Sequence, residues 1–400
     1  MSPDSSLLLP PSTHLLHIGP HKTGSTAIQV ALHEARDELG AAGVHYAGSG
    51  VRPRKAGWAI GVRGRPAGSQ PPPLKHWTNL VEDVASAGDQ RVCVSNEDFG
   101  RAEPEQIRRI VDDLGAGRPH VVAVARRLDK YLPSQWQERV KAGNRLTYDD
   151  WLRVVLARPE DGYSWDREQP GYNWDRVNVW YAHDTEALVR RWVDVVGPDR
   201  FTLIVSDERD RRMLPSTFEQ LLGLPEETLR LYPDRSNRSL SWSEVEMVRR
   251  INVAVHQRGL PLAERTRFVA RGLVRELTAR PAPEGSGSGP RVPPMPHWAA
   301  EQVRETSARR VAAVREMGVR VVGDADWLVM PDDAVIGDAD SPPPVSAETA
   351  AAAVDAAIGI AIERLESASG AATEDTVPAE TASPRGWLTR LRGGLVSRRA

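Results

Sequence analysis

Short apolar runs alternate along the chain with longer stretches in which apolar residues recur every three to four positions. The apolar runs are typical of buried strands and cover residues 14–18, 92–95, 120–125 and 201–205, with a shorter candidate at 43–46. The periodic stretches predict helices at residues 27–32, 76–87, 131–143, 184–196, 213–222, 241–255, 262–278 and 297–317, and two more that begin near Pro104 and Thr147. Strands that are separated by helices pair in parallel, so the pattern predicts an α/β fold with a central parallel sheet flanked by helices.

Composition divides the chain into one folded region and two flanks. Residues 1–11 are expected to be a flexible N-terminus, and residues 12–331 a single α/β domain. Within that domain, residues 281–296 are rich in Pro, Gly and Ser and read as a flexible insertion. Residues 332–400 have the Ala-, Ser- and Pro-rich composition of a largely disordered tail, with a short helix expected at 347–365.

Charge and cysteine content exclude several function classes. The 400 residues carry a formal charge of −2, which gives no general electrostatic reason to bind nucleic acid or an anionic membrane. The single cysteine, Cys93, excludes an internal disulfide and a cysteine-based metal cluster. No secretion signal and no apolar run of about 18 residues is present, so a cytoplasmic location without stable membrane insertion is expected.

The stretch from His14 to Thr26 combines a buried strand, a glycine-bounded turn and a helix start. Ser25 and Thr26 are predicted to cap the helix that follows. The backbone N–H groups of such a loop converge with the positive end of the helix dipole. This stretch is therefore predicted to bind a phosphate group.

The position of the lysine in this loop separates two kinds of phosphate site. Nucleotide triphosphatases use G-x-x-x-x-G-K-[ST], and Gly19 and Gly24 have that separation. Ser25 stands where such a loop needs its lysine, however, and Lys22 comes two residues before the second glycine. This order weakens an ATP or GTP interpretation.

The loop instead resembles that of the sulfotransferases that use 3′-phosphoadenosine 5′-phosphosulfate (PAPS). Their 5′-phosphosulfate loop has the form P-K-[ST]-G-[ST]-[ST], and this chain has Pro20-His21-Lys22-Thr23-Gly24-Ser25-Thr26, with one histidine inserted. The family binds the 3′-phosphate through an arginine at a strand end and a serine eight residues later, a separation that Arg126 and Ser134 match. The resemblance covers about residues 12–330. It implies a P-loop-type three-layer domain whose donor-binding residues include His21, Lys22, Thr23, Gly24, Ser25, Thr26, Arg126 and Ser134.

The resemblance also implies the reaction, which is metal-free in-line transfer of a sulfuryl group from PAPS. Lys22 is expected to stabilise charge on the leaving phosphate. Glu97 follows the strand at 92–95 and is the candidate base, because bacterial members of the family carry Ser-Ser-Glu where this chain has Ser95-Asn96-Glu97. A structural role for Glu97, as a cap or in orienting Lys22, explains the residue equally well. His21, His45 and His76 are the alternative bases.

Three further features are candidates for the edges of the site. Arg238 lies in a segment, residues 235–240, that resembles a late N-R-S segment of the bacterial members and is a candidate contact to the nucleotide. A basic loop at residues 48–73 is a candidate for covering the donor or recruiting an anionic acceptor; its cations are Arg52, Arg54, Lys55, Arg63 and Arg65. The aromatic residues Tyr163, Trp165, Tyr172 and Trp174 form either a stacking wall for an acceptor or ordinary packing.

The acceptor is expected to be a hydroxyl or amine of a carbohydrate, lipid or small molecule, with no nucleic acid as partner. Two alternatives to a sulfotransferase stay open. One is a P-loop kinase of nucleotides or small molecules, and the other is a non-catalytic binding protein with the same fold.

Overall fold

Six parallel strands form the centre of the molecule. The computed structural model describes residues 7–66, 69–157, 173–232, 239–280, 292–339 and 341–374. The strands are β1 (His14–His17), β2 (Val44–Tyr46), β3 (Arg91–Ser95), β4 (Pro119–Ala125), β5 (Phe201–Val205) and β6 (Arg320–Val322). They form one sheet in the order β2-β3-β1-β4-β5-β6, and every neighbouring pair is parallel. The predicted α/β class with a parallel sheet is confirmed.

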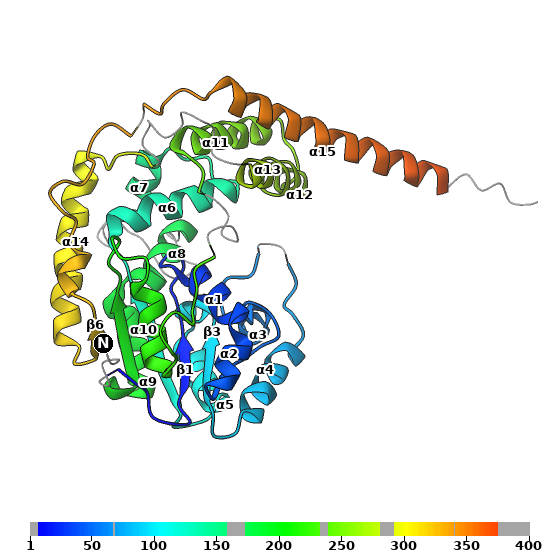
Figure 1. Cartoon of the computed structure of the whole chain (residues 1–400). Helices are drawn as coiled ribbons and strands as arrows, with labels where there is room; N and C mark the ends of the chain where they lie inside the picture. The colour runs from blue at the N-terminus through cyan, green and yellow to red at the C-terminus, as the bar shows by residue number, and fades with distance from the viewer. Residues whose placement is uncertain are drawn as a thin grey trace, which may run out of the picture.

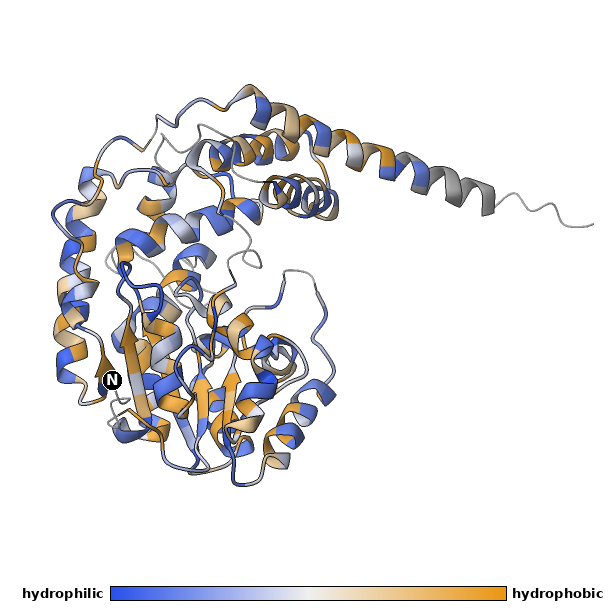
Figure 2. Ribbon diagram, in the orientation of Figure 1, coloured by the Kyte–Doolittle hydropathy of each residue, from blue (hydrophilic) through white to orange (hydrophobic). Residues whose placement is uncertain are grey.

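The inner strands β1, β3, β4 and β5 are buried on both faces, which explains why they appear in the sequence as largely apolar runs. All seven residues of β4 are buried. Its alternate residues enter different cores, because successive side chains of a strand point to opposite faces. Val121 and Ala123 belong to the core on one face, and Val122 and Val124 to the core on the other. Figure 2 shows the hydrophobic colour concentrated on the strands, whereas the helices around them carry both colours.

Helices cover both faces of the sheet and complete three layers (Figure 1). One core packs the strands against residues of α3, α4, α5, α9 and α14. The other packs them against α1, α2 and α10. The bounds of these helices are α1 (Ser25–Glu34), α2 (Arg36–Ala41), α3 (Arg54–Ala59), α4 (Lys75–Ser86), α5 (Pro104–Asp113), α9 (Thr185–Val196), α10 (Met213–Leu222) and α14 (His297–Glu316).

A further group of helices has its own core beyond one end of the sheet (Figure 1). Its members are α6 (Leu128–Lys141), α7 (Tyr148–Leu156), α8 (Trp174–His183), α11 (Trp242–Gln257), α12 (Leu262–Arg265), a π-helical segment (Thr266–Leu273), α13 (Val274–Ala279) and α15 (Ala347–Glu374). Because α6 begins three residues after β4 ends, this group stands at the carboxyl edge of the sheet. Ligands of open α/β sheets bind at that edge.

Several element boundaries differ from the sequence-based expectation. The helix expected at 131–143 begins at Leu128, and the one expected at 347–365 extends to Glu374. Residues 320–322 add an edge strand, β6, beside β5. Of the expected insertion at 281–296, residues 281–291 lie outside the described residues. No described helix has an apolar stretch of the length needed to cross a bilayer.

A large loss of stability is expected from truncating a buried tryptophan that joins a helix to the sheet. Trp192 of α9 is fully buried in the core that includes Leu203. Trp192→Ala should lower the free energy of unfolding by about 3–5 kcal/mol, because the buried ring leaves a cavity. Trp174→Ala is the matched control, since Trp174 is 41% exposed at the start of α8. Urea denaturation measures both, and equal losses would contradict this packing.

Candidate functional site

The loop between β1 and α1 is closed by hydrogen bonds to its own backbone. The hydroxyls of Thr23 and Ser25 both donate to the carbonyl of Pro20, over 2.7 and 3.1 Å. Gly19 and Gly24 have φ angles of 81° and 95°, which glycine adopts without steric cost, and Lys22 also lies in the left-handed region at 66°. These residues turn the chain from the strand into the helix.

The N-terminus of α1 corrects one prediction. Ser25 and Thr26 do not cap the helix: Gly24 is the N-cap, and no side chain is hydrogen-bonded to the first turn. The hydroxyl of Ser25 is directed to Pro20 instead, and Thr26 lies exposed within the first turn. The first backbone N–H groups of a helix have no partner inside it, and no acidic residue stands in this first turn. The end of α1 can therefore accept an anion.

The end of β3 packs directly against this loop. A Cβ atom on Gly19 would lie 2.7 Å from the Cβ of Glu97, so only glycine fits there. Two backbone hydrogen bonds hold the segment after β3 against the end of β1. Asn96 N–H donates to the His17 carbonyl, and Gly100 N–H donates to the Ile18 carbonyl. The predicted candidate base therefore lies beside the predicted phosphate loop.

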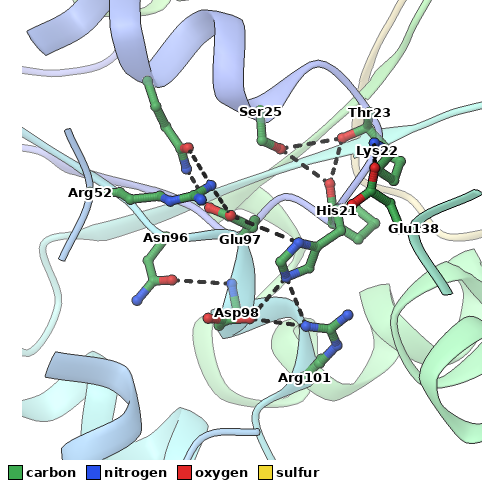
Figure 3. A network of polar contacts seen from close by, with 12 residues as sticks. His21, Lys22, Thr23, Ser25, Arg52, Asn96, Glu97, Asp98, Arg101 and Glu138 are labelled. Atoms are coloured by element: carbon green, nitrogen blue, oxygen red, sulfur yellow. Dashed lines mark hydrogen bonds and ion pairs between the residues drawn. The ribbon is translucent and has the colours of Figure 1, made fainter. Parts of the chain in front are cut away.

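Glu97 belongs to a buried network of charged side chains (Figure 3). One oxygen, Oε2, accepts from the amide of Gln29 over 2.6 Å, and the other, Oε1, accepts from the guanidinium of Arg52. His21 Nδ1 lies 3.8 Å from that same Oε1. Both oxygens of Glu97 are thus engaged within the protein.

His21 connects Glu97 to a second carboxylate, Asp98. His21 Nε2 lies 2.8 Å from Asp98 Oδ1 and 2.7 Å from Arg101 Nη1, and Arg101 also donates to Asp98 over 2.9 Å. The other oxygen of Asp98 accepts from the indole of Trp58 over 2.9 Å. Both ring nitrogens of His21 therefore face groups of the protein.

The network keeps its carboxylates ionised. Burial alone raises the pKa of Glu97, but His21, Arg52 and the Gln29 amide outweigh it, and the net pKa is lowered. For Asp98, His21, Arg101 and Trp58 outweigh burial in the same way and lower its pKa. Burial and the nearby Arg101 lower the pKa of His21, although both carboxylates oppose them. The result is a network of fixed charge at the side of the loop.

The two predicted phosphate-binding residues, Lys22 and Arg126, are in contact through the backbone of Lys22. The Nη1 group of Arg126 donates to the backbone carbonyl of Lys22 over 2.8 Å, across 104 residues of sequence. A buried guanidinium, that of Arg310 on α14, donates in turn to the carbonyl of Arg126 over 3.1 Å and to the hydroxyl of Thr185. Burial lowers the pKa of Arg310 to about 10, so it stays protonated at neutral pH. This chain of contacts fixes the backbone around both cations.

Each of the two cations also faces a carboxylate that the sequence did not single out. The ammonium of Lys22 lies 3.0 Å from Glu138 Oε1. The guanidinium of Arg126 makes two hydrogen bonds to Glu208, of 2.6 and 2.9 Å. The signals for these acids were weak but present, because Glu208 follows the end of β5 and Glu138 stands one helical turn after Ser134.

Ser134 lies on the helix that borders the loop. Residues four apart on a helix share a face, so Ser134 of α6 faces the same side as Glu138, which contacts Lys22. Arg52 of the predicted basic loop also reaches the site, through Glu97. Gln29, Asp98 and Arg101 are members of the network that sequence reasoning missed, although Asp98 is adjacent to a candidate.

Other candidates lie elsewhere or outside the described residues. His45 pairs with Asp83 of α4 at 3.0 Å, and His76 is half-buried on α4. Trp174 is exposed at the first position of α8. Arg238 and the aromatic residues Tyr163, Trp165 and Tyr172 lie outside the described residues. In the part of the chain that the structure covers, no group of three His, Cys, Asp or Glu side chains is arranged to hold a metal ion.

Comparison with known proteins gives a match to a solved structure but none to a family or a curated sequence. No protein-family model and no curated protein sequence matches the chain. A crystal structure of a sulfotransferase from Alicyclobacillus acidocaldarius matches with a TM-score of 0.36 and 15% identity, over 66% of this chain and 97% of that one. The likeness is distant. A match at this level carries no information on substrate or mechanism.

The close approach of the loop to β3 can be tested with two glycines. At Gly43, where φ is 74°, an added Cβ atom would contact no other group. Gly43→Ala should therefore lower the free energy of unfolding by about 1 kcal/mol, because of the backbone conformation alone. Gly19 has a similar φ, but an added Cβ atom there would also clash with Glu97. Gly19→Ala should therefore lower the free energy of unfolding by about 2–4 kcal/mol. Thermal and urea unfolding give the difference. Equal costs would mean that the loop does not pack on Glu97.

Proposed function

We propose that the chain binds PAPS and transfers its sulfuryl group to a hydroxyl or amine of a carbohydrate, lipid or small-molecule acceptor. The observation that carries the proposal is the 2.8 Å contact between Arg126 and the Lys22 carbonyl, because it joins the two motifs that resemble the family. A single adenosine bisphosphate has a phosphate for each motif.

The residues at this edge of the sheet fit such a donor. The first turn of α1 has no side-chain cap and no acidic residue, which suits the 5′-phosphosulfate. Lys22 is half-exposed beside it and supplies positive charge where the leaving phosphate becomes negative. Arg126 and Ser134 are the proposed partners of the 3′-phosphate. The donor itself supplies the activated sulfuryl group.

The buried network has a positioning role in this proposal. Glu97 binds Arg52 and Gln29 with its two oxygens and touches the loop at Gly19. His21 and Asp98 extend the same network to Arg101. These contacts hold the loop in one conformation before a ligand arrives, which reduces the cost of ordering it on binding.

Binding of adenosine 3′,5′-bisphosphate tests the proposal directly. Lys22→Ala and Arg126→Ala should each weaken binding about tenfold or more, because each removes a charge-assisted hydrogen bond worth about 1.5–3 kcal/mol. Lys75→Ala on the exposed surface of α4 is the control and should bind as the unmodified chain does. Isothermal titration calorimetry gives the dissociation constants.

Two outcomes would point to the alternatives. Unchanged affinity in both variants would remove the donor assignment, and tighter binding of ATP with Mg²⁺ than of the bisphosphate would favour a kinase. Binding of the bisphosphate with no transfer of labelled sulfate from PAPS, even to water, would favour a non-catalytic protein.

The carboxylate beside Arg126 should compete with the ligand. Glu208 occupies both arms of the guanidinium fork that a phosphate would use. Glu208→Gln should therefore tighten binding of the bisphosphate, by about two- to fivefold for a partly exposed ion pair. Glu226→Gln at an exposed position is the control. Weaker binding by Glu208→Gln would show that Glu208 organises Arg126 instead of competing for it.

A further inference from the structure

The proposed reaction needs a group that takes the proton of the acceptor, and the two carboxylates near Lys22 differ in their access. The Glu97 side chain is 2% exposed, and both of its oxygens accept hydrogen bonds from the protein. The Glu138 side chain is 41% exposed. A base must present a free lone pair to its substrate, which favours Glu138.

One oxygen of Glu138 is open. Oε1 accepts from two ammonium groups, from Lys22 at 3.0 Å and from Lys141 at 2.9 Å. Across the described residues, no donor is hydrogen-bonded to Oε2. Glu138 thus holds Lys22 with one oxygen and leaves the other for a further contact.

Glu138 also lies next to residues that are proposed to bind both phosphates of the donor. It belongs to the same face of α6 as Ser134, a proposed partner of the 3′-phosphate. Its other neighbour, Lys22, is the proposed partner of the phosphate that leaves. An acceptor hydroxyl that approaches Lys22 from the side of α6 would meet Glu138 first.

The two lysines set the proton affinity of Glu138. Burial raises its pKa, but Lys22 and Lys141 outweigh burial and lower the pKa below the ordinary value of a glutamate. Glu138 is therefore ionised at neutral pH but is a weak base while Lys22 remains beside it. If the Lys22 ammonium turns to an anionic ligand, one of these two cations is lost and the pKa of Glu138 rises.

We propose that Glu138 is the base of the reaction, and that it becomes available for this role when Lys22 leaves it for the phosphate of the bound donor. This inference rests on the proposed function. The proton of the acceptor hydroxyl passes to Glu138 Oε2, and the hydroxyl oxygen forms the new bond to sulfur. The bond between sulfur and the phosphate oxygen breaks, its electron pair stays on that oxygen, and Lys22 stabilises the resulting charge.

Proton uptake on ligand binding tests the coupling without any turnover. Adenosine 3′,5′-bisphosphate is titrated near pH 5 by calorimetry in two buffers of unequal ionisation enthalpy. Because the pKa of Glu138 is higher in the complex than in the free protein, the unmodified chain should take up protons, and its affinity should rise as the pH falls. Glu138→Gln should lose that part of the uptake, and Glu105→Gln on the exposed surface of α5 should retain it.

Release of labelled sulfate from PAPS tests the base, with water as the acceptor. Glu138→Gln should lower the release rate at pH 7 by about 100-fold or more, the usual contribution of a general base, and should change the affinity for the bisphosphate less than threefold. Glu138→Asp should recover part of the rate. Loss of a merely structural Glu138–Lys141 pair would not produce this separation of rate from affinity.

Each other result has a definite meaning. The inference is overturned if Glu138→Gln takes up as many protons on binding the bisphosphate as the unmodified chain does. It is also overturned if Glu138→Gln releases sulfate from PAPS at the unmodified rate. Release that is lost in Glu97→Gln but kept in Glu138→Gln assigns the base to Glu97. Failure of the unmodified chain to bind the bisphosphate, or to release sulfate, counts against the proposed function itself.

Discussion

The parallel pairing of β1 between β3 and β4 determines where the loop of Lys22, the network around Glu97 and Arg126 lie. His17, the last residue of β1, is level with Ser95 on one side and Val122 on the other. In parallel pairing the carboxyl ends of neighbouring strands meet at one edge, so the chain leaves β1 and β3 close together. The loop with Lys22, the network around Glu97 and the fork of Arg126 therefore meet at this edge, although more than a hundred residues separate the first from the last.

The sheet and its edge could be predicted from sequence, because both depend on local pattern. A strand covered on both faces must be apolar throughout, which is why β4 is evident in the sequence. Residues Arg320–Val322 form a short and partly exposed edge strand without that pattern, and β6 was not predicted as a strand. The cap of α1 was misassigned because a Ser–Thr pair at a helix start is typical of capping, whereas Ser25 binds the carbonyl of Pro20.

The ion pairs of the site follow from tertiary packing and leave little trace in local sequence. Glu138 reaches Lys22 across 116 residues, and Glu208 reaches Arg126 across 82. Motif reasoning identifies the cations, because family motifs describe groups that bind a ligand. It does not identify the acids that balance those cations. Positive charge assembled at one edge is costly unless it is paired or solvated, and these carboxylates provide the pairing.

The buried guanidinium of Arg310 joins α14 to the end of β4 and the start of α9. Its hydrogen bond to the Arg126 carbonyl spans 184 residues, and its other contacts go to Thr185. During synthesis the first strands leave the ribosome long before α14, so Arg126 lacks this support until α14 has been translated. A nascent chain that stops short of α14 therefore carries both proposed phosphate-binding motifs without the hydrogen bond that supports the backbone of Arg126.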